Sequence, residues 1–439
     1  MGPRRAILVV AMAVTAGILA ACSTPSTAST GSTASSVAIL PSDAPGVSAH
    51  SIIVGSLTTS SGALAAQFGQ VVDGVEAYLD AVDAKGGVDG RKIYLKYQAD
   101  DTGSPTGDTT QARNLVEEDH VFAVVGVGTP FFDGASFFAA EGTPAFGYVV
   151  SQDWNVHPDL FGAYGSYLDY SEVEPGLVDI AKTLKAKSVA VVAYDIAKQS
   201  EDSCAAVIKG LKRAGVHVGF QDLAFGLGAN PTADVLSMKA AHADFLISCM
   251  EGSDNLAFDQ AMHQNGMTDV HTLWLQGYDR AYLKQDPADM VGAIYLEQHV
   301  PFEAAAQFPG KYPAMEQYLK TMKKYEPKWT YDDLAFQGYL NAVQFVQGLR
   351  EEATTGKPLT QADLIAAINS EKAFTGGLTT PVNWSVAHDA PGKILCGSLV
   401  EVERGDVLKV IDVQKNDEVF ACVNDKGTLV RPPAGTPGL

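Results

Sequence analysis

The residue types that carry catalytic or metal chemistry occur in this sequence without the spacing that such chemistry needs. The nine His residues include no His-x-x-x-His or His-Glu-x-x-His pair, so no metal site is predicted. There is no Gly-x-Ser-x-Gly elbow and no Walker loop. Gly126-x-Gly128 supplies two glycines of a dinucleotide fingerprint, but Phe131 stands in the third position. We therefore expect no cofactor, no metal and no catalytic residue, and we interpret the chain as non-enzymatic.

The N-terminus has the pattern of an export signal. Arg4 and Arg5 precede an apolar stretch over residues 6–19, which is too short to span a bilayer. Leu19-Ala20-Ala21-Cys22 then resembles the lipobox of a bacterial lipoprotein. That resemblance implies a signal peptide over 1–21 and lipidation of Cys22; the alternative is an ordinary cleavage site with an incidental Cys. Ten of the fourteen residues in 23–36 are Ser or Thr, which predicts a flexible tether over 22–50.

Four further cysteines suit an oxidising compartment. They are Cys204, Cys249, Cys396 and Cys422, and an even number in an exported protein favours two disulfides, with three connectivities open. We favour Cys204–Cys249 and Cys396–Cys422 because each pair falls within one apparent structural unit. The alternative is buried free thiols.

Charge and hydropathy limit the partners. A net charge of −20 argues against nucleic acid and anionic membrane surfaces as partners. No later stretch approaches eighteen consecutive apolar residues, so the membrane is expected to be reached through the lipid anchor only. We place the protein in the cell envelope, exported and anchored to the outer face of the membrane.

The elements that must position any site alternate between strand and helix from Ser51 onward. Short apolar runs such as residues 121–125 are typical of parallel strands covered on both faces, and residues 68–82 have the helical period. Residues 394–402 and 407–413 read as a hairpin. Alternating units of this kind predict an α/β fold with parallel sheets, whose ligand sites lie beyond the carboxyl ends of the strands. The loops of interest follow Val54, Val125, Phe146, Tyr194, Cys249 and Leu275.

Several stretches together resemble a known family. They are 53–58, Gln67-Phe68-Gly69, the run Gly86-Gly87-Val88-Asp89-Gly90-Arg91, Asp100-Asp101, Val125-Gly126 and Thr375-Gly376-Gly377. This order resembles the type I periplasmic binding proteins of ABC transporters, the group of the leucine/isoleucine/valine-binding proteins. The resemblance implies two Rossmann-like lobes joined by three crossovers, a monomer, and permease and ATPase subunits as partners. We assign lobe 1 to 51–166 plus 300–374, lobe 2 to 167–299 plus 375–431, and a tail to 432–439.

The resemblance also suggests ligand-binding residues. Amino-acid binders of this family hold the ligand carboxylate with hydroxyl and N–H groups and its ammonium with an acid, because a buried zwitterion needs both charges paired. The positions so implicated are Phe68, Thr129, Ser151, Tyr194, Gln199, Glu251, Tyr278 and Asp279. Departures from the family pattern, such as Gln199-Ser200 in place of Tyr-Gly, also allow an apolar, aromatic or amide-like ligand.

Each of these positions has a structural alternative. Phe131, Phe132 and Phe146 suit a core as well as a ligand surface. Thr129 and Ser151 are typical helix caps. Glu251 and Asp279 are typical of solvated loops, and Asp100-Asp101 of a surface loop or cap.

The main functional hypothesis is the substrate-binding subunit of an ABC importer, capturing an amino acid or an amino-acid-like solute between two lobes. The alternatives are an extracellular sensor that reports a ligand to a membrane signalling partner, and a binder of an aromatic or amide solute. A hydrolase on the same scaffold ranks last, since no nucleophile–base set is visible.

Overall fold

In the computed structural model, two β-sheets hold the strands of the described residues, which are 41–170, 175–389, 394–413, 418–424 and 428–439. The predicted signal peptide, Cys22 and most of the predicted tether lie outside these ranges. The described residues belong to one compact unit. Among them, no helix combines the length and the apolar character needed to cross a membrane.

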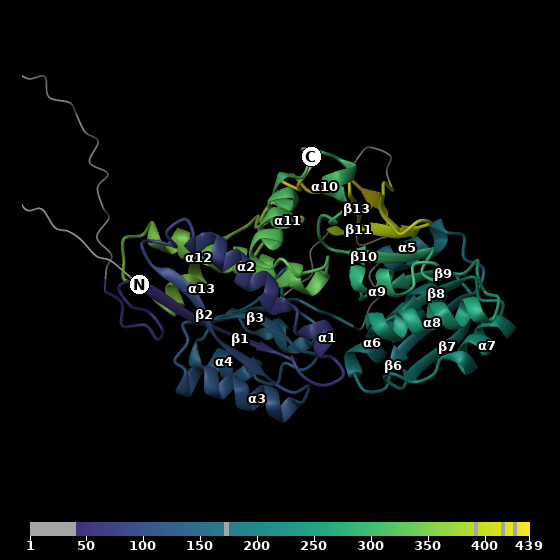
Figure 1. Cartoon of the computed structure of the whole chain (residues 1–439), viewed down its shortest axis with the longest axis horizontal. Coiled ribbons are helices and arrows are strands. Elements are labelled where there is room, and N and C mark those ends of the chain that lie inside the picture. Colours follow the sequence, from purple (N-terminus) through teal and green to yellow (C-terminus); the bar gives the residue numbers. More distant parts are fainter. Residues whose placement is uncertain (1–40, 171–174, 390–393, 414–417, 425–427) are drawn as a thin grey trace, which may run out of the picture. The chain divides into compact units, whose positions relative to one another are not determined.

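The first sheet is parallel and has the strand order β2-β1-β3-β4-β5 (Figure 1). Its strands are β1 (Ser51–Thr58), β2 (Lys92–Asp100), β3 (Ala123–Gly128), β4 (Ala145–Gly147) and β5 (Leu160–Gly162). The middle strand β3 is buried at every residue, as its apolar run predicts for a strand covered on both faces.

The second sheet is mixed, with the order β14-β13-β11-β10-β9-β8-β6-β7 and β12 paired to β11. Its parallel part is β6 (Val189–Tyr194), β7 (Val218–Phe225), β8 (Phe245–Ser248), β9 (His271–Trp274) and β10 (Ala293–Glu297). Its antiparallel part is β11 (Ile394–Glu403), β12 (Val407–Ile411), β13 (Phe420–Asn424) and β14 (Leu429–Val430). β11 and β12 pair antiparallel, which confirms the predicted hairpin. β11 also pairs with β10, with Ile294 opposite Glu401.

Helices cover both sheets. In the first part of the chain they are α1 (Ala65–Phe68), α2 (Val71–Asp83), α3 (Pro105–Arg113), the π-helix η1 (Asn114–Glu118), α4 (Ala135–Glu141) and the 3-10 helix η2 (Gln152–Val156). In the middle they are α5 (Pro175–Thr183), α6 (Lys198–Arg213), α7 (Thr232–Ala240), α8 (Gly252–Gln264) and α9 (Arg280–Gln285). The later ones are α10 (Ala304–Gln307), α11 (Pro313–Tyr325), α12 (Asp333–Ala353) and α13 (Gln361–Ser370).

Helices α2 and α12 lie side by side on the first sheet (Figure 1). They approach through two glycines. A Cβ atom on Gly74 would lie 1.7 Å from the carbonyl oxygen of Ala335, and one on Gly338 would lie 1.9 Å from that of Val71. Both distances are far below van der Waals contact, so this helix crossing depends on the missing side chains.

The two faces of the second sheet have separate cores because side chains alternate along each strand. Val189, Val191 and Ala193 of β6 pack with α5 and α6 in one apolar cluster. Ala190 and Val192 pack on the opposite face in a cluster that also takes residues of α7 and α8. The parallel strands are therefore covered on both sides, as the alternating pattern predicts.

The chain passes three times between elements of the two sheets, from β5 to α5, from β10 to α10 and from α13 to β11. The connecting segments bond to one another. The N–H of Ser166 donates to the carbonyl of Ala387 over 3.0 Å, and the N–H of Val300 donates to that of Leu378 over 2.8 Å. The predicted α/β fold with three crossovers is confirmed, whereas the residue limits of the two lobes and the tail stay a prediction.

Both favoured disulfides are present in the structure. Cys204 of α6 is bonded to Cys249 after β8, with their Cα atoms 6.0 Å apart. Cys396 of β11 is bonded to Cys422 of β13, its directly opposite residue, with the Cα atoms 4.0 Å apart. The first bond therefore ties a helix to the second sheet, and the second bond ties two strands of that sheet to each other.

Candidate ligand-binding site

A cavity of about 1710 Å³ lies at the carboxyl ends of strands from both sheets. In the second sheet its lining includes Tyr194 at the end of β6, Gln276 just after β9 and Glu297 at the end of β10. The first sheet contributes Tyr148 just after β4, and α1 contributes Phe68. This is the edge at which open α/β sheets bind ligands, and the predicted loops after Phe146, Tyr194, Cys249 and Leu275 meet there.

Amide side chains connect the two sides of the cavity. Gln67 Nε2 donates to Gln276 Oε1 over 2.6 Å, and Gln276 Nε2 donates to the Tyr148 hydroxyl over 2.7 Å. Gln199 Nε2 donates to the carbonyl oxygen of Pro130 over 2.6 Å. Gln276 is therefore the central polar contact between elements of the first and second sheets.

Three ionisable side chains, Glu297, His299 and Asp333, form a cluster at the cavity. His299 is fully buried, and its Nε2 lies 3.1 Å from Asp333 Oδ1 and 3.4 Å from Glu297 Oε2. His299 Nδ1 lies 2.8 Å from the carbonyl oxygen of Val300, which can only accept, so Nδ1 carries a hydrogen. The two carboxylates therefore converge on Nε2, and both of them also line the cavity.

The charges of this cluster influence one another. Burial, followed by the nearby Asp333 carboxylate, raises the pKa of Glu297 to about 8. Burial acts to lower the pKa of His299, but its hydrogen bonds to Asp333 and Glu297 outweigh burial and raise that pKa to about 10. Near pH 7 His299 is thus an imidazolium, and Glu297 is a carboxylic acid that ionises readily when a cation approaches.

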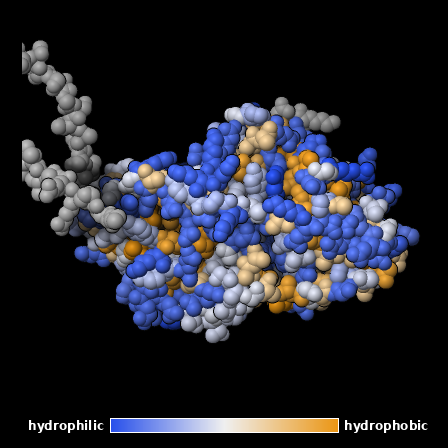
Figure 2. Space-filling model, in the orientation of Figure 1, coloured by the Kyte–Doolittle hydropathy of each residue, from blue (hydrophilic) through white to orange (hydrophobic). Residues whose placement is uncertain are grey.

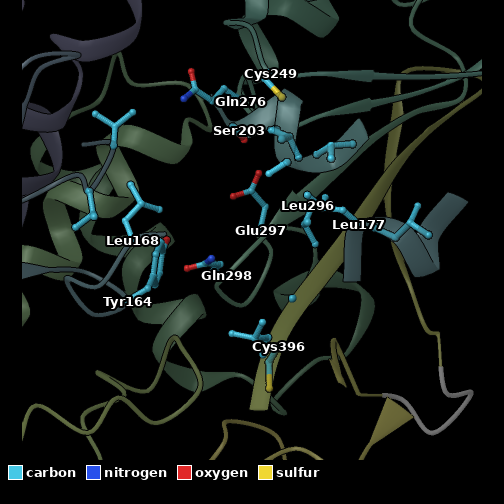
Figure 3. Close-up of a pocket in the computed structure, with 18 of the residues that line it drawn as sticks. Tyr164, Leu168, Leu177, Ser203, Cys249, Gln276, Leu296, Glu297, Gln298 and Cys396 are labelled. Atoms are coloured by element: carbon cyan, nitrogen blue, oxygen red, sulfur yellow. The ribbon is translucent and has the colours of Figure 1, made fainter. Parts of the chain in front are cut away.

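Two hydrogen-bonding atoms at the cavity lack partners within the described part of the chain. They are the hydroxyl of Tyr164 and Oε1 of Gln67, both buried. Figure 3 shows Tyr164 beside Gln298, with Glu297 between them and Leu296. Because buried polar atoms are normally paired, these two atoms are suited to a polar group of a solute.

Four of the eight predicted ligand-binding residues line the cavity: Phe68, Tyr194, Gln199 and Glu251. The ring of Phe68 lies 6.1 Å from that of Tyr148. The hydroxyl of Tyr194 donates to Asp254 Oδ2 over 2.7 Å. Both are therefore already engaged with protein neighbours at the edge of the cavity.

Glu251 and Asp279 are buried N-caps of helices and not the solvated loop charges considered above. Glu251 accepts from the N–H groups of Ser253 and Asp254, at 2.9 and 3.0 Å, at the start of α8. Asp279 accepts from the N–H of Ala281 at 2.6 Å at the start of α9. Asp279 is also absent from the cavity lining. Both carboxylates thus satisfy helix N–H groups, which leaves the predicted ammonium-binding role without support at these positions.

Three other predicted residues, Thr129, Ser151 and Tyr278, bond to protein neighbours outside the cavity lining. The hydroxyl of Thr129 donates to Asp101, and that of Ser151 lies 2.9 Å from Asp153 Oδ2. Neither caps a helix through its side chain. Tyr278 is buried and donates to Glu303. These three residues do not line the cavity.

Phe132, Phe146 and Asp101 are buried among protein neighbours. Phe132 and Phe146 are buried in the core, and Phe132 stacks on Trp154 at 4.4 Å. Asp101 accepts from Thr59 Oγ1 and from the Gly103 N–H, at 2.7 and 2.8 Å. The core alternative describes Phe132 and Phe146, whereas Asp101 is fully buried and is not the surface-loop or cap residue considered above, because Ser104 caps the following helix.

No local sequence pattern pointed directly to Glu297, Asp333, Gln276 or Tyr164 as site residues. Glu297 and His299 lie beside the second crossover, and Asp333 is the first residue of α12. One signal was available: Asp332-Asp333 precedes a helical pattern, and Asp332 is the N-cap, accepting from the N–H of Ala335 at 2.6 Å. An acidic residue directly after an N-cap lies on the first turn of its helix. Asp333 is therefore at the start of α12, the end of the helix that meets the cavity.

Comparisons with known proteins agree with this arrangement. A family model described as periplasmic binding protein matches residues 51–406. Leu/Ile/Val-binding protein homolog 7 of Brucella abortus is 26% identical over 339 residues, covering 72% of this chain and 81% of the relative. The homologous protein of Brucella melitensis is 25% identical over 347 residues, covering 73% and 83%.

Solved structures share the fold. A fatty acid ABC transporter substrate-binding protein from Thermomonospora curvata has a TM-score of 0.68 at 16% identity, covering 84% of this chain and 93% of that one. A branched-chain amino acid transporter substrate-binding protein from Streptococcus pneumoniae, in complex with isoleucine, has a TM-score of 0.67 at 15% identity, covering 82% and 99%.

Proposed function

The chain belongs to the periplasmic binding protein family, and from this premise we propose that it captures an amino acid or amino-acid-like solute for an ABC importer. The observation that carries the proposal is the cavity at the strand ends, to which both sheets contribute polar side chains. The relatives from Brucella are named for leucine, isoleucine and valine, which supports this solute class. The family consists of substrate-binding proteins, and the energy for uptake would come from permease and ATPase partners.

Within this function, we assign the ammonium group of the solute to Glu297 and Asp333. These two carboxylates converge beside the cavity around His299, whereas Glu251 and Asp279 are occupied as helix caps. A cation that enters would pair with Glu297 and favour its ionised form. The Tyr164 hydroxyl and Gln67 Oε1 are unpartnered among the described residues and suit the other polar groups of the solute.

Export and anchoring complete the proposal. We assign residues 1–21 to a lipoprotein signal peptide and Cys22 to lipidation, which would hold a monomeric binding domain at the outer face of the membrane. The two disulfides support export, because such bonds persist in oxidising compartments.

Isothermal titration calorimetry with amino acids, amides and aromatic acids tests the proposal. At pH 7, amine-bearing solutes are expected to bind with release of up to about one proton, since Glu297 has a pKa of about 8 in the free protein and ionises on binding. Measuring the heat in buffers of different ionisation enthalpy gives the number of protons released.

Matched variants separate the acid cluster from the capping acids. Glu297→Gln should weaken amine binding at least about thirtyfold and abolish proton release. Asp279→Asn, which removes a buried carboxylate outside the cavity lining, should leave affinity within about twofold. A panel in which no solute binds would overturn the proposed function, and equal affinities in both variants would overturn the assignment of the ammonium site.

A further inference from the structure

The cavity continues beyond the polar cluster into an apolar space, here called the apolar chamber. Its walls are contributed by α5, α6 and one face of the second sheet. The lining side chains that define it are Leu177, Ile180, Leu184, Val207, Ile294, Leu296, Leu399 and Ile411. Ile180, Leu184, Leu296, Leu399 and Ile411 are only partly buried, so the α5 segment and the face of the sheet beneath it both keep apolar surface at the cavity.

The chamber adjoins the polar cluster along a single strand. Leu296 and Glu297 are consecutive residues of β10, so their side chains point to opposite faces of the sheet. Figure 3 shows Leu296 and Leu177 on one side of Glu297, and Tyr164 and Gln298 on the other. Leu296 and Glu297 both line the same cavity, and Glu297 is the last residue of β10. A solute whose polar group contacts Glu297 at the strand end therefore has the apolar walls within reach of the rest of its length.

The size of the cavity favours a solute larger than a free amino acid. Its volume of about 1710 Å³ exceeds the roughly 300–1,000 Å³ of pockets that enclose drug-sized ligands. The charged side chains near α5, α6 and β12 in this lining are Lys182, Arg213 and Asp412, each of which has an interaction partner. The walls between them and Glu297 offer methyl and methylene groups.

We infer that the solute is an amphiphile, with a cationic or polar end at Glu297 and a flexible apolar chain that fills the apolar chamber between α5, α6 and the second sheet. This inference rests on the proposed function and specifies its solute class. Burying the chain removes apolar surface of both solute and protein from water, which is favourable roughly in proportion to the area covered. The amino-acid-like end and the chain are recognised by separate parts of one cavity.

A homologous series of linear primary amines, from propylamine to dodecylamine below the micellar concentration, tests this inference by calorimetry. Each added methylene group should tighten binding about fourfold until the chamber is filled, after which affinity levels off. If short and long amines bind equally, the inference is overturned while the proposed function stands. If no amine and no amino acid binds, both are overturned.

Variants locate the chain. Ile180→Asp places a charge in the chamber and should abolish the gain per methylene, while the affinity for the shortest amine stays unchanged. Ile180→Trp, which keeps an apolar wall and fills space, should shift the levelling-off to shorter chains. The matched control is Leu236→Asp on α7, where the side chain is 50% exposed, and it should leave the series unchanged. A series that is identical in both Ile180 variants and the parent would overturn the inference.

Discussion

Replacing Gly338 by Ala tests the packing that holds the first sheet and its helices together. In an ordinary helix interior this change is favourable by about 1 kcal/mol, because Ala has the higher helix propensity. Here the new Cβ atom would lie 1.9 Å from the carbonyl oxygen of Val71 and 3.2 Å from its Cγ1 atom. A backbone oxygen cannot rotate away, so α2 and α12 must move apart by roughly 1 Å, a gap that forfeits up to about half of the dispersion energy of each contact.

The expected net effect is a loss of about 2–4 kcal/mol in the free energy of unfolding, from overpacking that outweighs the gain in propensity. Guanidinium titration followed by circular dichroism measures it. Gly348→Ala in the same helix is the matched control, because its Cβ would meet only side-chain atoms, Ile368 Cγ1 at 2.6 Å and Leu364 Cδ1 at 2.8 Å, and a side chain can change rotamer whereas a backbone oxygen cannot. We expect that control to cost less than about 1 kcal/mol. A Gly338→Ala protein as stable as the parent would refute the reasoning.

Three further outcomes are expected. Changing Cys204 and Cys249 to Ser opens a loop of 45 residues and should lower the free energy of unfolding by about 4 kcal/mol, measured in urea; a loss below about 1 kcal/mol contradicts this. Thr129→Val removes a hydrogen-bond donor to the buried Asp101 carboxylate and should lower the free energy of unfolding by about 1–3 kcal/mol, with unchanged solute affinity. Weakened binding in this variant would show instead that Thr129 belongs to the binding site. The free energy of unfolding should fall as the pH rises from 6.5 to 8. The folded-state pKa values of about 8 for Glu297 and about 10 for His299 exceed the ordinary values of these groups, so the folded state binds more protons than the unfolded state. Urea titrations that show stability rising across this range would contradict the raised pKa values.

Much of the fold could be predicted from local patterns. The apolar run at 121–125 gave the buried strand β3, and the two alternating stretches at 394–413 gave a hairpin, because strand periodicity is set by the chain itself. Hydrophilic residues cover most of the face seen in Figure 2, in keeping with the net charge of −20. These features depend on neighbours in the sequence and can therefore be read from it.

The residues of the candidate binding site could not be predicted from local patterns in the same way. Glu251 and Asp279 follow strands where a ligand-binding acid is expected, but a residue there can equally cap the next helix, and Glu and Asp suit both roles. Glu297 and Asp333 face each other only because the second crossover brings the end of β10 to the start of α12. No local pattern encodes a contact of that kind, since it depends on how far the chain has turned between them.

The pairing of β10 with β11 sets a time at which the second sheet can be completed. Ile294 is opposite Glu401, and at about 5–20 residues per second the ribosome needs roughly 5–20 s to make the chain between them. Until then β10 presents an unpaired edge to the nascent chain, and the parallel strands before it form an unfinished sheet. We expect the second sheet to be completed late in synthesis. This leaves an interval in which an export machinery could engage a chain that has not yet folded.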